Sequence, residues 1–425
     1  MSQEINKAEK QDLSLVVQAI GTDLEHTQVR VVASANADML FHYWKVGHFI
    51  LYLQKKEGWG SKVIDNLSKA IRSKYPDKKG YSRRNIFYMC QFASAYPLEV
   101  LKEMDRIDSL LTTPTVEKVL SLTNELNQIV QQPVALIQAT ENQSNTIMQQ
   151  PVAQLEEVTE ILSTIYHCDI SQIEEIFKQS AIVRTNWASH VILLNSKLPL
   201  GECYWYITQA VANGWSRNVL QMQIESNLFA RQITTKKVSN FSVRLPKPQS
   251  DLANYLMKDP YIFDMMGQTD KMAERDIERQ LVSHITKYLL EMGSGFAFVA
   301  QQKHFEVGDS DFYADLILYN IPLHAYVVVE LKATPFKPEY MGQLNFYINV
   351  VDDTLRGEHD NKTIGLLLCN GGDKVVAQYA LSGYDQPIGV SDYQLSKAIP
   401  DNLKSALPTV EEVEEELSKI VDKNI

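Results

Sequence analysis

The chain has 425 residues, of which 45% are hydrophobic, and a formal net charge of −11 at pH 7. This length exceeds what one ordinary hydrophobic core holds, so two domains are expected. Its four cysteines stand far apart with no close C-x-x-C pair, which excludes a zinc knuckle and a secreted disulfide framework. The sequence has no apolar signal core and no run of roughly 18 apolar residues, so we expect a cytoplasmic protein with reduced cysteines and no membrane partner.

The charge is unevenly distributed along the chain. Residues 251–425 carry 15 basic and 28 acidic side chains, a formal charge of −13, whereas residues 1–250 carry a formal charge of +2. Within the first half, the stretch from Lys55 to Arg84 holds ten basic and three acidic residues. Because a phosphate-binding surface needs positive charge, we expect such a surface in the N-terminal half.

The N-terminal half shows the pattern of packed helices. Apolar residues recur at helical spacing over residues 13–96, which predicts three or four helices, and again over residues 188–231. Over residues 101–181 the pattern weakens, and the string Gln-Gln-Pro-Val-Ala at 131–135 returns at 149–153. Two copies are too few for a solenoid, so we interpret this segment as an insertion with helical stretches.

Two strings in this half share a local pattern, Gly80–Asn85 and Gly214–Asn218. In each, a glycine and an aromatic residue precede a serine that suits a helix N-cap, and arginine follows at once. A cation at a helix N-terminus opposes the helix dipole, and a phosphate docked there would offset this cost. An arginine that bridges to a carboxylate on a neighbouring helix explains the pattern equally well. Nucleic-acid contacts are therefore a hypothesis for Arg83, Arg84 and Arg217.

The C-terminal half alternates strands and helices. A linker is expected over residues 241–265, where Pro246 and Pro248 stand in a weakly periodic sequence. Hydrophobic patterns beyond it predict a helix at 276–292, strands at 296–302, 312–319 and 325–331, a helix at 338–351 and a strand at 363–369. This order favours an α/β domain with a mixed central sheet.

Polar residues end the apolar strand 325–332. Glu330 and Lys332 are two residues apart and share a face, so they project together from the strand end. The preceding strand can pair antiparallel with this one and bring Asp315 beside Glu330. Two carboxylates so close repel each other unless a cation lies between them, and Mg²⁺ is the simplest such cation. Lys332 could then orient or deprotonate a water, although a simple salt bridge between Glu330 and Lys332 explains the strand end equally well.

Two predicted helices add polar groups that face the same place. Glu278 lies on the apolar stripe of the helix 276–292, where a carboxylate is costly unless it is paired or metal-bound. Gln343 and Tyr347 are four residues apart on the later helix and point toward the sheet. Asp311 shares a strand face with Asp315, but only Asp315 directly precedes an apolar run, so we assign the carboxylate role to Asp315 and a hairpin position to Asp311.

This order of residues resembles the PD-(D/E)XK nuclease superfamily, and within it the RecB-like branch with a QxxxY helix. The strings at 295–299, 311–316, 330–332 and 342–347 resemble the YhcG family, whose N-terminal domain is all-helical. The resemblance implies hydrolysis of phosphodiester bonds with Mg²⁺ or Mn²⁺. It places Glu278, Asp315 and Glu330 around the metal, Lys332 near the nucleophile, and Gln343 and Tyr347 as supporting or nucleic-acid-contacting residues.

We therefore expect an all-helical domain at 1–240 with an insertion at about 101–181, a linker at 241–265, and a PD-(D/E)XK (restriction-endonuclease-like) α/β domain at 266–425. The expected function is a metal-dependent nuclease, with DNA favoured as substrate. The alternative is an inactive nuclease fold that serves as a scaffold for DNA or protein partners, against which the intact set of Asp315, Glu330 and Lys332 argues. A third hypothesis, an RNA-directed hydrolase, is not distinguished from the first by charge. Whether the protein forms a homo-oligomer is left open.

Overall fold

The structure is a computed structural model. It describes residues 34–52, 62–76, 80–110, 114–131, 158–264, 289, 291–293 and 295–396. The chain divides into two compact units: one comprises Met1–Ser109 with Glu125–Ile207, and the other comprises Leu110–Asn124 with Thr208–Ile425. A mainly helical N-terminal part followed by a C-terminal mixed sheet is the fold class that the sequence predicts.

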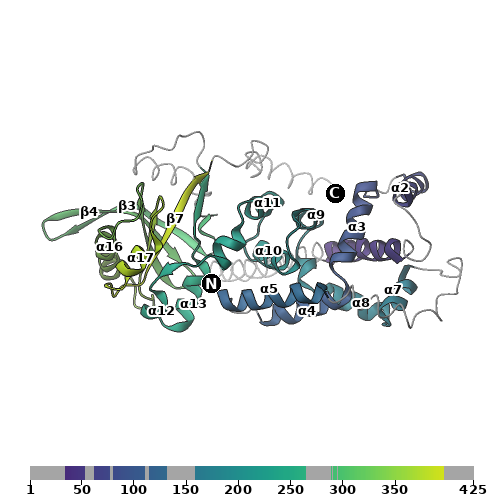
Figure 1. Ribbon diagram of the computed structural model, residues 1–425, viewed down its shortest axis with the longest axis horizontal. Helices are drawn as coiled ribbons and strands as arrows, with labels where there is room; N and C mark the ends of the chain where they lie inside the picture. The colour runs from purple at the N-terminus through teal and green to yellow at the C-terminus, as the bar shows by residue number, and fades with distance from the viewer. Residues whose placement is uncertain are drawn as a thin grey trace, which may run out of the picture. The chain divides into compact units, whose positions relative to one another are not determined.

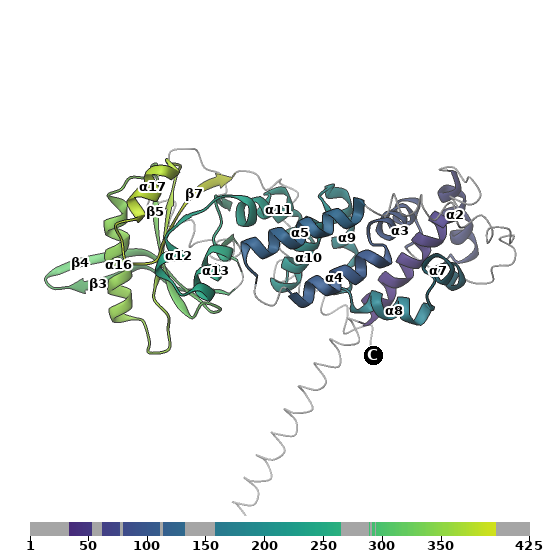
Figure 2. The ribbon, with the colours of Figure 1, turned by 60° about the horizontal axis from the view of Figure 1, so that its bottom comes forward.

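The first unit is built from helices (Figures 1 and 2). A helix at residues 34–52 is followed by α2 (Lys62–Lys74), α3 (Arg83–Ala95), α4 (Leu98–Leu110), α5 (Val116–Gln131), α7 (Val158–Tyr166), α8 (Ile170–Gln179), the short turn η3 (Ala181–Arg184), α9 (Trp187–Ser196) and α10 (Leu200–Ala212). The boundary between the two units falls within α5 and within α10. Aromatic side chains fill its core: Phe41 and Phe177 have ring centroids 5.2 Å apart. The buried indole of Trp44 donates a hydrogen bond to the carbonyl oxygen of Tyr96 at 2.7 Å, so the polar atom of the largest core side chain is satisfied.

The segment expected to be an insertion largely belongs to this helical core. In α4 and α5, Leu101, Met104 and Leu126 are fully buried, as is Phe177 in α8. These helices are therefore packed elements of the unit, and an insertion at about 101–181 stays a prediction. Most of the repeated string lies in residues 132–157, outside the described residues.

The second unit contains a mixed sheet with the strand order β1-β7-β6-β5-β4-β3, and β2 pairs with β7. Its strands are β1 (Val238–Ser239), β2 (Tyr261–Asp264), β3 (Phe296–Val307), β4 (Ser310–Asn320), β5 (Ala325–Lys332), β6 (Ile364–Cys369) and β7 (Ile388–Ser396). Its helical elements are α11 (Arg217–Glu225), the π-turn η4 (Ala230–Thr234), α12 (Phe241–Arg244), α13 (Lys247–Leu256), α16 (Tyr340–Thr354) and α17 (Lys374–Leu381). The pairs β3–β4 and β4–β5 are antiparallel, whereas β5–β6 and β6–β7 are parallel.

A hydrophobic core lies on each face of this sheet. Along β5, Val327, Val329 and Leu331 join the core that α12 and α13 cover, whereas Val328 joins the core under α16 and α17. Figures 1 and 2 show the two pairs of helices with the sheet between them. Because helices cover both faces, β5 and β6 are apolar nearly throughout, which is why their sequences lack a polar face.

The expected linker at 241–265 is instead folded onto the sheet. It forms α12, α13 and β2, and Phe241 and Met257 are buried in the core on that face. A side chain at Gly389 in β7 would place its Cβ 2.9 Å from the Phe241 ring, so this glycine permits the close packing. Pro246 and Pro248 misled the prediction because they lie at the N-cap and in the first turn of α13, where proline does not disturb a helix.

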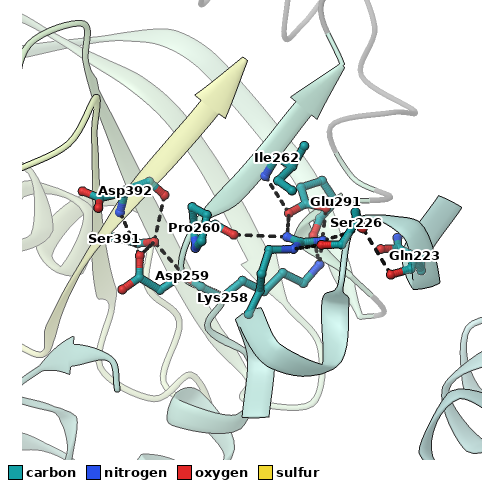
Figure 3. A network of polar contacts seen from close by, with 10 residues as sticks. Gln223, Ser226, Lys258, Asp259, Pro260, Ile262, Glu291, Ser391 and Asp392 are labelled. Carbon is teal, nitrogen blue, oxygen red and sulfur yellow. Dashed lines mark hydrogen bonds and ion pairs between the residues drawn. The ribbon is translucent and has the colours of Figure 1, made fainter. Parts of the chain in front are cut away.

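A buried polar network fixes this segment within the second unit (Figure 3). The Arg231 guanidinium contacts Glu291 Oε1 at 2.5 Å, and that oxygen also accepts a hydrogen bond from the main-chain nitrogen of Ile262 at 2.9 Å. Lys258 donates to the carbonyl oxygen of Glu291. Burial lowers the pKa of Lys258 to about 8, and nearby Glu291 opposes this change. Three stretches far apart in sequence are thus tied together around one carboxylate.

Among the described residues, no helix combines the length and apolarity that a membrane crossing requires. All four cysteines are free thiols. Cys90, Cys203 and Cys369 are buried and Cys168 is half-buried.

Candidate active site

The carboxylates of Asp315 and Glu330 meet where β4 and β5 part. The antiparallel register pairs Leu316 with Val329, and one further step along it sets Asp315 opposite Glu330. The Asp315 main-chain nitrogen lies 3.5 Å from Glu330 Oε1, and Leu331 N donates to Asp315 Oδ2 at 3.1 Å. The structure therefore brings together the two carboxylates that the strand pattern pairs.

Glu330 is fully buried, in contrast to the exposed strand end that its position in the sequence suggests. Burial and the neighbouring Asp315 raise the pKa of Glu330 to about 8, and Lys332 opposes this rise. Lys332 Nζ lies 3.3 Å from Glu330 Oε2, and the same ammonium lies 5.6 Å from the ring centroid of Tyr340. A mostly buried lysine is thus held between a carboxylate and an aromatic face.

Helix α16 brings Tyr347 to the same face of the sheet. Tyr347 is buried, and burial raises the pKa of its phenol, which a hydrogen bond with Gln343 partly counteracts. Glu330 and Asp315 raise this pKa further, so both carboxylates act on the Tyr347 hydroxyl electrostatically. Gln343 itself is exposed. Tyr347 therefore lies within the site, and Gln343 lies at its rim.

The sequence offers two further carboxylates, Asp311 and Glu278, and the structure describes the first of them. Asp311 is exposed on the β3–β4 hairpin, and its Oδ1 lies 2.6 Å from His304 Nε2, which agrees with the hairpin position given to it. Glu278 lies outside the described residues. No group of three acidic, histidine or cysteine side chains suited to a metal ion occurs within the described part of the chain.

The carboxylates present nevertheless suit a magnesium ion. Glu330 Oε2 is buried and accepts no hydrogen bond within the described part of the chain, so its contact there is the ion pair with Lys332. Magnesium is usually held by one or two carboxylates and keeps several waters. Asp315 and Glu330 fit that requirement.

Two contacts of the site were missed by the sequence motifs. Gln302 donates its amide Nε2 to Asp315 Oδ1 at 3.1 Å, and the hydroxyl of Tyr340 lies 2.5 Å from Thr334 Oγ1 while its ring faces Lys332. The only sequence feature that pointed to Tyr340 was its position on the same helix face as Gln343 and Tyr347.

The serines before the arginines cap helices as predicted. Ser82 Oγ accepts from Asn85 N at 3.2 Å, and Ser216 Oγ accepts from Val219 N at 3.3 Å. Within the described residues, neither Arg84 nor Arg217 forms an ion pair with a carboxylate. Arg84 lies against the Tyr88 ring, with 5.6 Å from its guanidinium carbon to the ring centroid, and donates to the Tyr88 hydroxyl at 3.3 Å.

Comparison with known proteins gives matches to both halves of the chain. Residues 254–408 match the YhcG PDDEXK nuclease domain, and residues 19–122 match the DUF1016 N-terminal domain. An Escherichia coli (strain K12) protein named "Putative nuclease YhcG" is 28% identical over 203 residues, which make up 48% of this chain and 54% of that protein. The match thus spans about half the length of this relative.

Among solved structures, a repair endonuclease from Pyrococcus abyssi aligns with a TM-score of 0.21 and 14% identity, over 31% of this chain and 50% of that chain. Neither the family matches nor the description of the site uses this alignment. The two matches, to a DUF1016 N-terminal domain and to a YhcG PDDEXK nuclease domain, agree with the family that the motifs resemble.

Proposed function

We propose that the protein hydrolyses phosphodiester bonds of DNA with Mg²⁺ or Mn²⁺ as its cofactor. The observation that carries this proposal is the juxtaposition of Asp315 with the buried Glu330, whose Oε2 lies 3.3 Å from Lys332 Nζ. A structural salt bridge needs one carboxylate and one cation. The second carboxylate adds repulsion that a bound metal ion would relieve, and without one it raises the pKa of Glu330.

Each residue of the site has a distinct task in this proposal. Asp315 and Glu330 hold the metal, and Glu278 is proposed as a further ligand. When bound, the metal supplies a Lewis acid that activates a water and stabilises charge on the phosphate. The Lys332 ammonium, held by Glu330 and Tyr340, orients the attacking water, and Lys332 would accept a proton from it only in its neutral form. Tyr347 supports the carboxylates, and Gln343 contacts the nucleic acid at the rim.

DNA binding is proposed for the arginines at the two capped helix starts. Arg84 and Arg217 are exposed, and the described residues provide neither of them with a carboxylate partner. Helix N-termini and arginine forks both favour phosphate oxygens. Arg83 is proposed as a third contact because it adjoins Arg84.

The test of this function is a cleavage assay on linear, nicked, branched and single-stranded DNA and on RNA, with and without Mg²⁺. We expect Mg²⁺-dependent cleavage that is abolished in Glu330→Gln and Lys332→Ala. Glu330→Gln should stay folded without divalent ions, because the neutral amide has a similar shape and relief of the repulsion from Asp315 offsets the lost ion pair with Lys332. Asp311→Asn is the matched control, since Asp311 lies on the same strand but is exposed and paired with His304.

Undiminished cleavage in both Glu330→Gln and Lys332→Ala would overturn the assignment of the site. The scaffold alternative is distinguished by calorimetry. Binding of Mn²⁺ by the wild type, and its loss in Glu330→Gln, supports the nuclease, whereas nucleic-acid binding without any Mn²⁺ binding or cleavage supports the scaffold.

A further inference from the structure

Strand β3 breaks its alternation at Gln302. Side chains on a regular strand alternate between faces, so two residues an odd number apart lie on opposite faces. Ala300 and Phe305 are five residues apart, yet both pack against the core under α16. Between them Gln302 has a φ of +45°, in the left-handed region that residues other than glycine rarely adopt. This residue is where the strand changes face.

Strand β4 carries a matching break at Asp315. Ala314 and Ile317 are three residues apart, and both are buried in the same α16-side core. The register pairs Gln301 with Leu316 and Lys303 with Ala314, so Gln302 lies directly opposite Asp315. The two irregular positions therefore face each other across the β3–β4 ladder. Asp315 lies one residue beyond the last pair of β4 with β5, Leu316 with Val329.

The paired break fixes both oxygens of the Asp315 carboxylate. Oδ1 accepts from the Gln302 amide at 3.1 Å, and Oδ2 accepts from Leu331 N at 3.1 Å. The register of the ladder continues across this pair, so the break changes the backbone conformation without adding a residue. Gln302 is exposed on the edge strand of the sheet, so core packing does not require its strained backbone.

We propose that Gln302 is a positioning residue for the nuclease reaction. Its left-handed backbone turns the amide toward Asp315, and the amide orients the carboxylate toward Glu330 for metal binding. In this proposal Gln302 contacts neither the substrate nor the attacking water, and it acts through Asp315 alone. The inference rests on the proposed function, because it assigns a task to a neighbour of the proposed metal ligand.

The test uses two substitutions at this position in the full chain. Gln302→Gly keeps the left-handed backbone at no steric cost and removes the amide. Gln302→Glu keeps the length of the side chain and replaces the donor by a second carboxylate. Gln301→Ala is the matched control, a neighbouring glutamine whose register partner is Leu316. Single-turnover cleavage, KM for DNA, Mn²⁺ affinity by calorimetry and the melting temperature are measured for each.

For Gln302→Gly we expect kcat to fall and the Mn²⁺ dissociation constant to rise, each by about tenfold to a hundredfold, since a hydrogen bond to a charged group is lost. KM for DNA should stay unchanged. The melting temperature should stay the same or rise by up to about 2–4 °C, because the glycine relieves the strain. Gln302→Glu should lose at least as much activity, and Gln301→Ala should behave as the wild type.

Wild-type kcat and Mn²⁺ affinity in Gln302→Gly would overturn the inference. So would a parallel loss of melting temperature and activity that cooling restores, because that pattern belongs to a residue with a structural role only. Failure of the proposed function looks different: the wild type itself then neither cleaves DNA nor binds Mn²⁺, and Glu330→Gln is indistinguishable from it.

Discussion

Two histidines of the helical unit are enclosed by aromatic rings. His48 and His190 are buried, and burial lowers their pKa values to about 3 and about 4. His190 lies 4.9 Å from Phe92 between ring centroids, and its Nε2 is 2.9 Å from the carbonyl oxygen of Ile182. Both rings are therefore neutral in the folded protein at pH 7, and each must gain a proton in a site that disfavours charge when the solution becomes acidic.

This arrangement predicts acid destabilisation that His190→Gln reduces. The unfolded pKa is about 6.5, so the contribution of the neutral histidine is fully present above that pH and is lost as the pH falls toward about 4. Between pH 7 and 5 the loss is on the order of 2 kcal/mol per histidine. Urea unfolding at both pH values, followed by tryptophan fluorescence, should show a smaller pH-dependent loss in His190→Gln than in the wild type and in the exposed control His359→Gln. Equal losses of unfolding free energy between the two pH values in all three proteins would contradict the role given to His190.

The sequence reveals those site residues whose side-chain type is itself informative. It does not reveal residues whose role depends on the backbone geometry of the fold. Asp315, Glu330 and Lys332 were predicted because a carboxylate or lysine at the end of an apolar strand is unusual. Gln302 could not be predicted, since nothing in a glutamine indicates a left-handed backbone. The burial of Glu330 was likewise invisible, because it depends on α16 packing over the strand end.

At the scale of elements, local patterns predicted local structure. The strand 325–331 is observed as β5, and the predicted helix 338–351 as α16, within a few residues at each end. The elements β1, β2 and β7 were missed. β1 has two residues, and β2 pairs with β7 in a register that joins Tyr261 to Tyr393, so these strands depend on contacts between distant parts of the chain. Such contacts leave no mark on hydrophobic periodicity.

The folded state of the expected linker predicts where the nuclease domain can be cut. A chain beginning at residue 266 lacks the core residues Phe241, Leu245, Met257, Tyr261 and Phe263. Each large buried apolar side chain contributes about 1.5–3 kcal/mol, so their loss approaches the roughly 5–15 kcal/mol that stabilises a whole domain. We expect residues 266–425 not to melt cooperatively and residues 213–425, which begin directly after α10, to do so, as measured by calorimetry. If the shorter chain melts cooperatively at the same temperature as the longer one, residues 241–265 are not needed for folding and act as a linker.

At the scale of the whole molecule, the more basic half of the chain and the candidate metal site are on different parts of the sequence. The half with the candidate metal site has a formal charge of −13 and the other half +2. An acidic domain is badly placed to hold a polyanion unaided, although a bound cation lowers the local repulsion. The division predicts that much of the binding energy for DNA comes from residues outside the metal site.

The dependence of DNA binding on salt tests this division of labour. Each phosphate contact releases counterions, so its loss should lower the slope of log affinity against log salt by roughly 0.7–0.9. Arg84→Ala should weaken DNA binding and lower the slope by about the amount expected for one phosphate contact. The double replacement of Arg83 and Arg84 by Ala should lower it by up to about twice that amount. The affinity for Mn²⁺ should stay unchanged in both variants. Arg106→Ala is the matched control, because it removes the same charge from an arginine already paired with Glu103 and Glu125. If Arg84→Ala and Arg217→Ala both keep the wild-type affinity and slope, these arginines are structural and the DNA-binding surface lies elsewhere on the chain.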